Sequence, residues 1–313
     1  MLDYALRRLL AMVPVLGVVG LFVFSLLYIT PGDPALVIAG DRATPDELDR
    51  IRVALGLNEP FLTRLTHWTL AVLRGDLGVS IFSNVPVTEL IAQRLEPTLS
   101  LSVIAILVAV SAAIPAGALA ALYAGRWPDR VLMGFAVLGF SVPVFVISYV
   151  LVMVFSLHLE WLPVQGFVSL REGFWPFLSH MILPGAALGS VYMALIARVS
   201  RASLLEVMGQ DYIRTAKAKG LGTARIVVRH ALKNAGVPIA TIIGIGIGLL
   251  ITGVVVTETV FAIPGLGRLV VDAILRRDYP VIQGVILFFA AAYVVVNFLV
   301  DLSYTWFDPR ITY

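Results

Sequence analysis

Residues that could perform chemistry are few in this sequence and lie far apart. The chain of 313 residues has no cysteine, which excludes disulfides, thiolate catalysis and cysteine-ligated zinc or iron–sulfur centres. No H-E-x-x-H motif is present, and the histidines all lie outside the centres of the apolar runs: His67, His158, His180 and His230. The pattern therefore predicts neither a metal site nor catalytic residues.

The sequence also predicts no nucleotide site. The pattern G-x-x-x-x-G-K-[ST] of phosphate-binding loops does not occur, so we expect this chain not to be an ATPase of that type. Glycines at 244, 246 and 248 lie inside an apolar stretch, without the preceding strand or the following acidic residue of a dinucleotide fold. Close packing between membrane helices explains these small residues better.

The elements that must position any functional side chain are membrane helices. Hydrophobic residues make up 59% of the chain and charged residues 14%, against about 45–50% and about 25% in soluble domains. A helix crosses a bilayer with roughly 20 apolar residues, and a barrel is disfavoured because the apolar runs do not alternate. Six runs without Asp, Glu, Lys or Arg reach or approach that length: about 9–30, 98–123, 131–157, 181–197, 237–257 and 281–300.

The distribution of charge predicts the orientation of these spans. With the N-terminus inside, the inner segments carry a formal charge of +7 and the outer segments −4, although the whole chain is only +3. Positive residues concentrate on the cytoplasmic side of membrane proteins. Both termini are therefore predicted to be cytoplasmic, and loop 198–236 holds most of the evidence, with eight Lys and Arg residues.

The long outer segment 31–97 has the pattern of short helices. Thr44, Pro45 and Glu47 form a capping-box signature. Apolar residues then recur at helical spacing up to Gly56, and two further amphipathic stretches cover Phe61 to Val72 and Pro86 to Leu95. We expect helices on the outer membrane surface or capping the bundle, since this segment is too poor in large apolar residues for a separate domain.

The inner loop 198–236 is predicted to form two helices joined by a glycine elbow. Helix-forming residues run from Ser200 to Lys219, glycines follow at 220 and 222, and a second helix covers Ala224 to Asn234. Such a protrusion could fit a groove of a partner. The alternative is a solvated basic loop attracted to anionic lipid. Nucleic-acid binding is not expected, because the basic residues are few and aromatics do not interleave with them.

Polar groups near the spans suggest only weak candidates for a translocation path. Asn297 lies deep in the last run and Ser141 lies in the third, whereas charged residues are missing from the middle of every run. Pro14, Pro115 and Pro143 are expected to kink their helices. These residue patterns alone indicate a channel or transporter subunit that depends on another protein for its energy source. A self-sufficient secondary carrier or channel is the main alternative, and a membrane-embedded enzyme is a further one.

Four stretches together resemble the permease subunits of bacterial dipeptide, oligopeptide, nickel and glutathione ABC importers. They are PGDP at 31–34; GDLGVS at 75–80 with RLEPTL at 94–99; DYIRTAKAKG at 211–220; and FAIPGLGRL at 261–269 with RDYP at 277–280 and DPR at 308–310. The third resembles the EAA loop of such permeases. Gly220, Leu232 and Ala216 match that motif, whereas Arg214, Thr215, His230 and Lys233 depart from it.

This resemblance implies roles for particular residues. The first helix of the inner loop would be a coupling helix that docks into an ATPase subunit, with these candidate residues: Asp211, Tyr212, Arg214, Thr215, Ala216, Lys217, Ala218, Lys219 and Gly220. Independently of the resemblance, charged residues cluster around the last outer loop, Glu258, Asp272, Arg276, Arg277 and Asp278; they could bind substrate, but interfacial pairs and a docking surface are favoured. The candidate set for docking a binding protein or forming an outer gate is Glu258, Pro264, Gly265, Arg268, Asp272, Arg277 and Asp278.

The resemblance also implies an assembly. The chain would be the first, B-type permease, an all-α integral membrane protein of six transmembrane helices with the type I ABC importer fold. Its partners would be a second homologous permease, two ABC ATPases that bind ATP and magnesium, an extracytoplasmic solute-binding protein, and lipid of the bacterial inner membrane. The expected parts are 1–30 (first span), 31–97 (periplasmic helical segment) and 98–313 (permease core with coupling loop 198–236).

Overall fold

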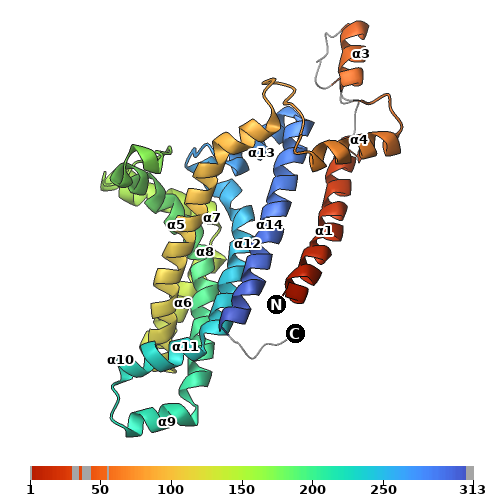
Figure 1. The fold of residues 1–313 in the computed structure, drawn as a ribbon. Helices are drawn as coiled ribbons and strands as arrows, with labels where there is room; N and C mark the ends of the chain where they lie inside the picture. The colour runs from red at the N-terminus through yellow and green to blue at the C-terminus, as the bar shows by residue number, and fades with distance from the viewer. Residues whose placement is uncertain (1, 30–34, 37–43, 55, 308–313) are drawn as a thin grey trace. The chain divides into compact units, whose positions relative to one another are not determined.

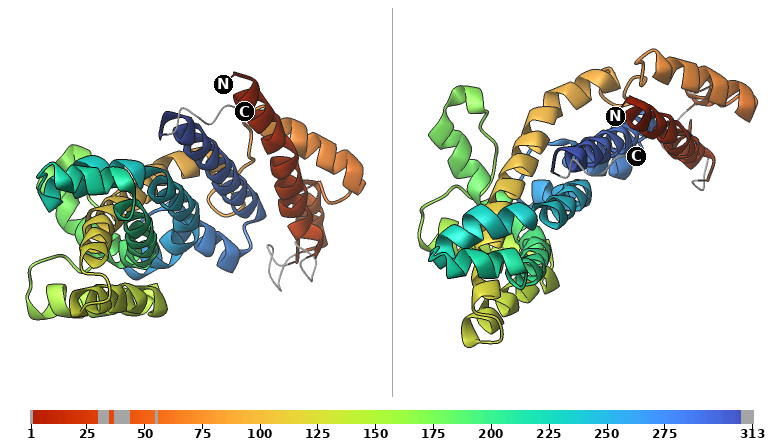
Figure 2. Two further views of the ribbon diagram at one scale, coloured as in Figure 1. Left: turned by 90° about the horizontal axis from the view of Figure 1, so that it is seen from below. Right: turned by 60° about the horizontal axis from the view of Figure 1, so that its bottom comes forward.

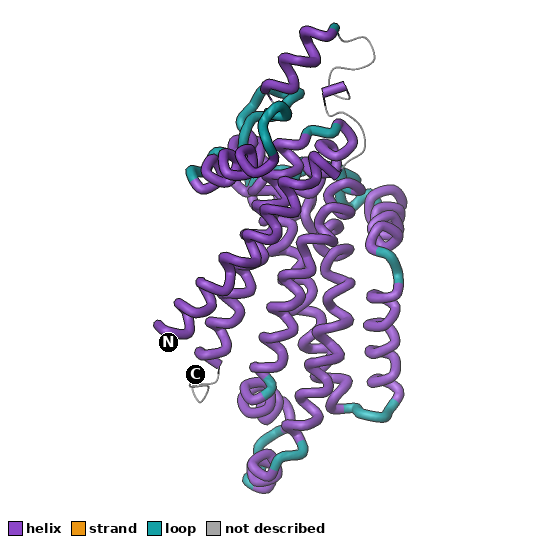
Figure 3. The backbone as a smooth tube through the Cα atoms, turned by 90° about the vertical axis from the view of Figure 1, so that its right-hand side faces the viewer, coloured by secondary structure: helices purple, strands orange, loops and turns teal. Residues whose placement is uncertain are grey.

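The structure is a computed structural model that describes residues 2–29, 35–36, 44–54 and 56–307. Helices dominate this described part, and the only β pairing within it is an isolated bridge between Val79 and Pro86 (Figure 3). Contacts divide the chain into two compact units. Unit 1 comprises residues up to Leu95 together with Arg268–Val294, and unit 2 comprises Glu96–Gly267 together with the residues from Val295 on. The three-part division expected from the sequence stays a prediction.

The predicted set of membrane helices is present. Four unbroken helices are long and apolar enough to cross a membrane: Leu10–Ile29, Val87–Leu122, Phe174–Met208 and Tyr279–Val300. Two bent pairs, Trp127–Ser141 with Val144–His158 and Thr223–Asn234 with Gly236–Gly248, raise the number to six if each pair is one span. The all-α membrane fold predicted from the sequence is confirmed. The short fourth run does borrow its flanks, because α8 extends over Phe174–Met208.

The third predicted span is broken rather than kinked. Helix α6 (Trp127–Ser141) ends at Val142, and α7 (Val144–Leu151) begins after Pro143 and continues into a π-helix, η1 (Val152–His158). The two halves are bent by 106°. Proline has no N–H to donate and disfavours helical backbone in the preceding residue, and Val142 is extended accordingly, with φ −88° and ψ 129°.

Unit 2 is organised around α8. This helix packs against α6, α7 and α12 (Gly236–Val260), as two of the views show (Figures 1 and 2). Small residues bring α8 close to α5 (Val87–Leu122): a Cβ added at Gly189 would lie 2.7 Å from the Ala105 carbonyl oxygen. The glycine run of α12 also serves packing, since Gly244 lies against Val300 of α14 (Tyr279–Phe307). The prediction of close packing at this run is confirmed.

Unit 1 joins α1 (Leu2–Ile29) to the outer helix α4 (Phe61–Leu73) through aromatic rings. The Phe24 ring lies 5.4 Å from the rings of Phe61 and Trp68. Arg64 lies over the Phe24 ring and donates a 3.2 Å hydrogen bond to the Tyr28 hydroxyl. The predicted amphipathic face of this segment is therefore the face that packs on α1.

Two other expectations for the outer segment have different outcomes. Helix α3 (Pro45–Ala54) forms where the capping signature predicts a helix, and Gly56 follows it with φ +63°. The stretch from Pro86 to Leu95 is not a separate helix, because α5 begins at Val87 and runs through Pro97 without a break. The PGDP stretch at 31–34 and the DPR stretch at 308–310 lie outside the described residues.

Candidate functional site

The inner loop contains one more helix break than the sequence predicts. Helix α8 ends at Met208, Gln210 is extended, and α9 (Asp211–Ala218) begins as a new helix. The second half of the elbow is helical and consists of α10 (Thr223–Ile226), the π-helix η3 (Val227–Ala231) and α11 (Leu232–Asn234). The expectation of one helix from Ser200 to Lys219 is wrong, because the backbone of Gln210 is extended, with φ −73° and ψ 151°, and separates α8 from α9.

An apolar cluster fixes α9 to the rest of the elbow. Ile213 and Ile226 are completely buried, and Ala216 is 8% exposed. Met208 and Leu221 complete the cluster as half-buried neighbours. These residues come from the end of α8, from α9, from the turn after it and from α10, so a small apolar core holds α9 as a rigid element.

A glycine turn ends α9 in a defined geometry. The Gly220 N–H donates to the Lys217 carbonyl at 2.9 Å, and the Leu221 N–H donates to the Ala216 carbonyl at 3.2 Å. This pair of bonds is a Schellman motif, which places its glycine in the left-handed region. Gly220 has φ +78°, and Leu221 contacts the cluster beneath α9. The glycine predicted to break the helix therefore also orients the return segment.

Most of the residues that are expected to contact an ATPase subunit lie on the outward face of α9. These side chains are exposed: Asp211, Tyr212, Arg214, Thr215, Lys217, Ala218 and Lys219. We call these seven residues the α9 face. Ala216 differs from them because it points into the elbow's own core. The structure thus brings together the expected residues and separates those that can meet a partner from one that supports the helix.

An ion pair that the sequence did not reveal anchors α8 just before the elbow. Arg201 donates two parallel hydrogen bonds to Asp129, from Nε to Oδ1 at 2.6 Å and from its terminal amino group to Oδ2 at 2.7 Å. Asp129 is buried and also accepts from the Gly125 N–H at 2.8 Å. Beside this pair, Gly117 of α5 lies so close that an added Cβ would be 2.7 Å from Ser200 Cβ. The end of α8 is therefore tied to both α5 and α6.

At the opposite end of α12, the turn FAIPGLG is built around Glu258. The Glu258 side chain is completely buried, and Thr98 of α5 donates to it at 2.6 Å. The same Thr98 hydroxyl accepts from the Leu266 N–H at 2.8 Å. Gly265 lies directly against the carboxylate, where any Cβ would overlap it. Glu258 and Gly265 thus shape the turn that leads into α13 (Leu266–Arg276).

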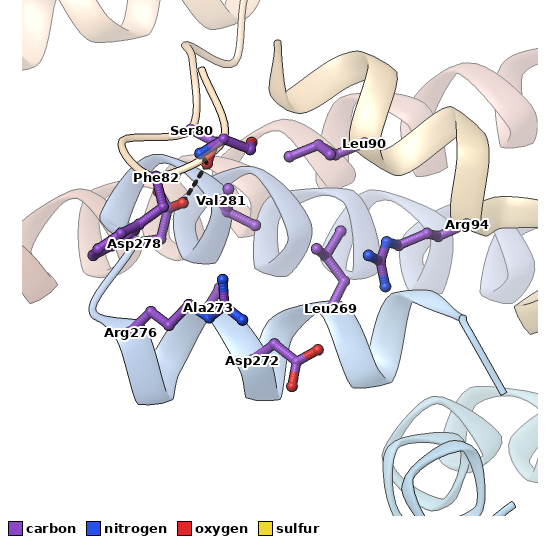
Figure 4. Close-up of a pocket in the computed structure, with 11 residues that line it drawn as sticks. Ser80, Phe82, Leu90, Arg94, Leu269, Asp272, Ala273, Arg276, Asp278 and Val281 are labelled. Carbon is purple, nitrogen blue, oxygen red and sulfur yellow. Dashed lines mark hydrogen bonds between the residues drawn. The ribbon is translucent and has the colours of Figure 1, made fainter. Parts of the chain in front are cut away.

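A second buried carboxylate, that of Asp278, links two distant segments of unit 1 (Figure 4). Asp278 is 5% exposed and accepts from the Ser80 hydroxyl at 2.5 Å and from the Ile81 N–H at 3.3 Å. Arg277 before it has φ +57°. Two of the recognised motifs, GDLGVS and RDYP, are therefore joined by this hydrogen bond within unit 1. This hydrogen bond links residues that are 198 positions apart in the sequence.

The remaining outer candidates are accessible. Pro264 and Arg277 are exposed, and the side chains of Arg268 and Asp272 keep 41% and 47% of their surface on α13. Sequence reasoning did not predict α13 as a helix. Its signal was present, because Leu266, Leu269, Val270 and Ala273 recur at helical spacing and are all buried. A role of the outer set in docking stays a prediction.

The path candidates are placed less distinctively. Asn297 is half-buried on α14, and Ser141 is exposed at the end of α6, with its hydroxyl donating to the Val137 carbonyl of its own helix at 2.9 Å. A role for either in translocation stays a prediction. Within the described ranges, no group of three His, Asp or Glu side chains is placed to hold a metal ion.

These features define a multi-pass, all-helical membrane protein of the transporter class. Residues 113–313 match the family described as "Binding-protein-dependent transport system inner membrane component", and residues 1–102 match the family of its N-terminal part. The chain belongs to this family of importer permeases. The resemblance found in the sequence motifs is thereby confirmed.

Two relatives that are similar to the chain over nearly its whole length are permeases. A probable peptide ABC transporter permease of Sinorhizobium fredii is 52% identical over 310 residues and 99% of each chain. The glutathione transport system permease of Escherichia coli K12 is 42% identical over 313 residues and the full length of both. A solved structure of the MetNI methionine ABC transporter, facing inward, matches with a TM-score of 0.58 at 16% identity, over 70% of this chain and 96% of that one. This last likeness concerns the fold alone. The chain is therefore the non-catalytic permease subunit of an ABC importer.

Proposed function

We propose that this chain is the first of two homologous permeases that together form the path for peptides or a similar small solute. Two ABC ATPases, which bind ATP and magnesium, would drive the transport, and an extracytoplasmic solute-binding protein would deliver the solute. The support is full-length similarity to a probable peptide permease at 52% identity and to a glutathione permease at 42%.

Helix α9 is the proposed contact with an ATPase subunit. Its buried side holds it rigidly through Ile213 and Ala216, whereas the side chains of the α9 face are exposed. A rigid helix transmits movement better than a loop. The buried ion pair between Asp129 and Arg201 fixes the end of α8. A displacement of α9 would therefore be transmitted through α8 to α5 and α6.

On the other side of the membrane, the proposed docking region is the turn after α12 together with α13. Its accessible members are Pro264, Arg268, Asp272 and Arg277, whereas Glu258, Gly265 and Asp278 hold the backbone beneath them. Asn297 and Ser141 are retained as candidates for the path. The proposed location is the bacterial inner membrane with cytoplasmic termini, supported by the charge of +7 for inner and −4 for outer segments.

A charge reversal on α9 tests the coupling proposal. In proteoliposomes that contain the complete complex, Arg214→Glu is expected to lower solute uptake per ATP hydrolysed by about tenfold, equivalent to ~1.4 kcal/mol, because it opposes docking. Arg126→Glu makes the same charge change at an exposed position before α6 and is expected to leave that ratio unchanged. Wild-type coupling in Arg214→Glu would contradict the role of the α9 face.

A further inference from the structure

Helix α4 crosses the C-terminal end of the membrane helix α1, and both helices belong to unit 1 (Figure 1). The Trp68 ring lies 5.4 Å from the Phe24 ring and next to Gly20, where an added Cβ would be 3.7 Å from it. The Phe61 ring lies 5.4 Å from the Phe24 ring and 5.0 Å from the Tyr28 ring. Helix α4 therefore contacts α1 between Gly20 and Tyr28.

This contact lies inside the apolar layer that α1 crosses. The membrane-spanning part of α1 is Leu10–Ile29, and Phe24 precedes its end by five residues, about 7.5 Å along the axis. The neighbouring span Tyr279–Val300 gives a second measure, because Gln283, about 6 Å from its start, donates to the Val23 carbonyl at 3.3 Å. Amphipathic helices bind bilayers with their apolar side buried at a similar depth, about 5–10 Å.

The surface of α1 beside this contact is apolar and exposed. Leu21 and Phe22 are 47% and 59% exposed, and Val18, one turn deeper, is 68% exposed. On a membrane helix, apolar side chains of this kind face the hydrocarbon tails of lipid. Lipid is therefore expected around α1 at the level where α4 crosses it.

The exposed surface of α4 has an apolar side and a polar side. Leu62 and Leu73 are 72% and 78% exposed, and they project from the same side because they lie about three helical turns apart. Thr66 lies between them, with its hydroxyl bonded to a carbonyl of its own helix. His67 lies about 140° around the helix from Leu62, and its Nδ1 is 3.2 Å from the exposed Glu59 carboxylate. A carboxylate is costly to remove from water, so this second side faces water.

The side chains between α4 and α1 are of the kind found at a membrane–water interface. Tyr and Trp gather at this level of a bilayer, and the contact contains Tyr28 and Trp68. Arg64 lies 5.4 Å from the Phe24 ring centre and donates a 3.2 Å hydrogen bond to the Tyr28 hydroxyl. The Arg64 charge is thus stabilised by rings and a hydroxyl at a depth where an isolated charge would be costly.

We propose that α4 is embedded in the bilayer leaflet around the end of α1, which is the outer leaflet in the proposed orientation. Leu62 and Leu73 contact lipid acyl chains there, and His67 lies at the water surface. The depth of the contact selects lipid as the occupant, because a soluble protein outside the membrane does not reach acyl chains.

Nitroxide labels on single cysteines test this arrangement in the complete complex in nanodiscs. The chain has no cysteine, so Leu62→Cys and Leu73→Cys each give one labelling site when the partner subunits are also free of cysteine. Molecular oxygen concentrates in hydrocarbon, whereas a polar nickel chelate stays in water. We expect oxygen to relax both labels more strongly than the chelate does. His67→Cys, on the same helix, is the matched control, and the opposite order is expected there.

Two results would overturn the inference. Stronger relaxation by the nickel chelate at positions 62 and 73 would place that side of α4 in water, and protection from both reagents would show that a protein chain covers it. Thr66→Cys keeps the test valid if a leucine variant fails to fold, because it replaces a small exposed side chain on the same side and is expected to behave alike. Transport is not part of this measurement, so its outcome is independent of the proposed function.

Discussion

At the scale of single residues, buried carboxylates hold together segments that are distant in the chain. Asp129 pairs with Arg201, 72 residues away, through two hydrogen bonds. Thr98 and Glu258 are 160 residues apart, and Ser80 and Asp278 are 198 apart. A buried carboxylate is costly unless it is paired or hydrogen-bonded. Each of these pairs therefore fixes one arrangement of its helices and opposes the alternatives.

The pair between Asp129 and Arg201 gives a direct prediction for stability. Asp129→Asn leaves the Arg201 charge without its carboxylate in a buried setting, which costs about 3 kcal/mol, the lower end of the range for such pairs, because Arg201 keeps 29% of its surface. The midpoint of thermal unfolding of the purified complex measures this change.

An exposed pair provides the control for that experiment. Asp49 lies 3.2 Å from Arg52, with 71% of the aspartate side chain exposed, so Asp49→Asn is expected to leave the midpoint almost unchanged. Equal midpoints for the Asp129 and Asp49 variants would contradict the prediction that the buried pair stabilises the protein more than the exposed pair does.

The sequence indicated only part of this residue-scale organisation. Glu258 and Asp278 were recognisable as charges in an outer loop, but their burial was not, because their partners Thr98 and Ser80 lie far away in sequence. Asp129 and Arg201 gave no signal except as loop charges. Periodicity and motif spacing describe neighbours along the chain, and these pairs depend on packing between helices.

At the scale of elements, the sequence predicted helices well and their interruptions poorly. The membrane helices, α3, α4 and the glycine elbow all formed where apolar spacing and capping residues indicated. The breaks at Gly209 and Pro143 and the continuation of α5 through Pro97 were not predicted correctly. A proline or glycine marks a place where a helix can stop, whereas tertiary packing decides whether it does. The amphipathic helix α13 was missed although its apolar spacing was readable.

The end of α9 is the element whose local geometry is most readily tested. Gly220→Ala places a side chain at φ +78°, and left-handed backbone costs such a residue about 1–2 kcal/mol. No atom lies within 4 Å of the added Cβ, so the cost is one of backbone conformation alone. We expect faster amide hydrogen exchange across residues 211–221, measured by mass spectrometry on the complex.

Gly222 offers a matched control two residues further on. Its added Cβ also has no atom within 4 Å, but its backbone has φ −65° and ψ 147°, which any residue adopts. Gly222→Ala is therefore expected to exchange like the wild type. Similar exchange in both alanine variants would show that the left-handed turn does not hold α9 in place.

At the scale of the whole molecule, the chain is the permease subunit of an ABC importer, and we propose that other proteins of the complex hydrolyse ATP and select the solute. Its sequence carries no phosphate-binding loop, and its permease relatives extend over its full length. The function was predictable because the motifs that carry the resemblance occur in order along nearly the whole chain. The solute was not, because the apolar runs contain no charged residue that would select one.

Solute uptake into proteoliposomes tests the central claim most directly. The assembly of this chain with its second permease and its ATPases is expected to take up solute only when ATP is present on the side of the α9 face and loaded binding protein is on the other side. Vesicles that contain this chain alone are expected neither to take up solute nor to hydrolyse ATP. Uptake or ATP hydrolysis by the chain alone would contradict its assignment as the permease subunit of an ABC importer.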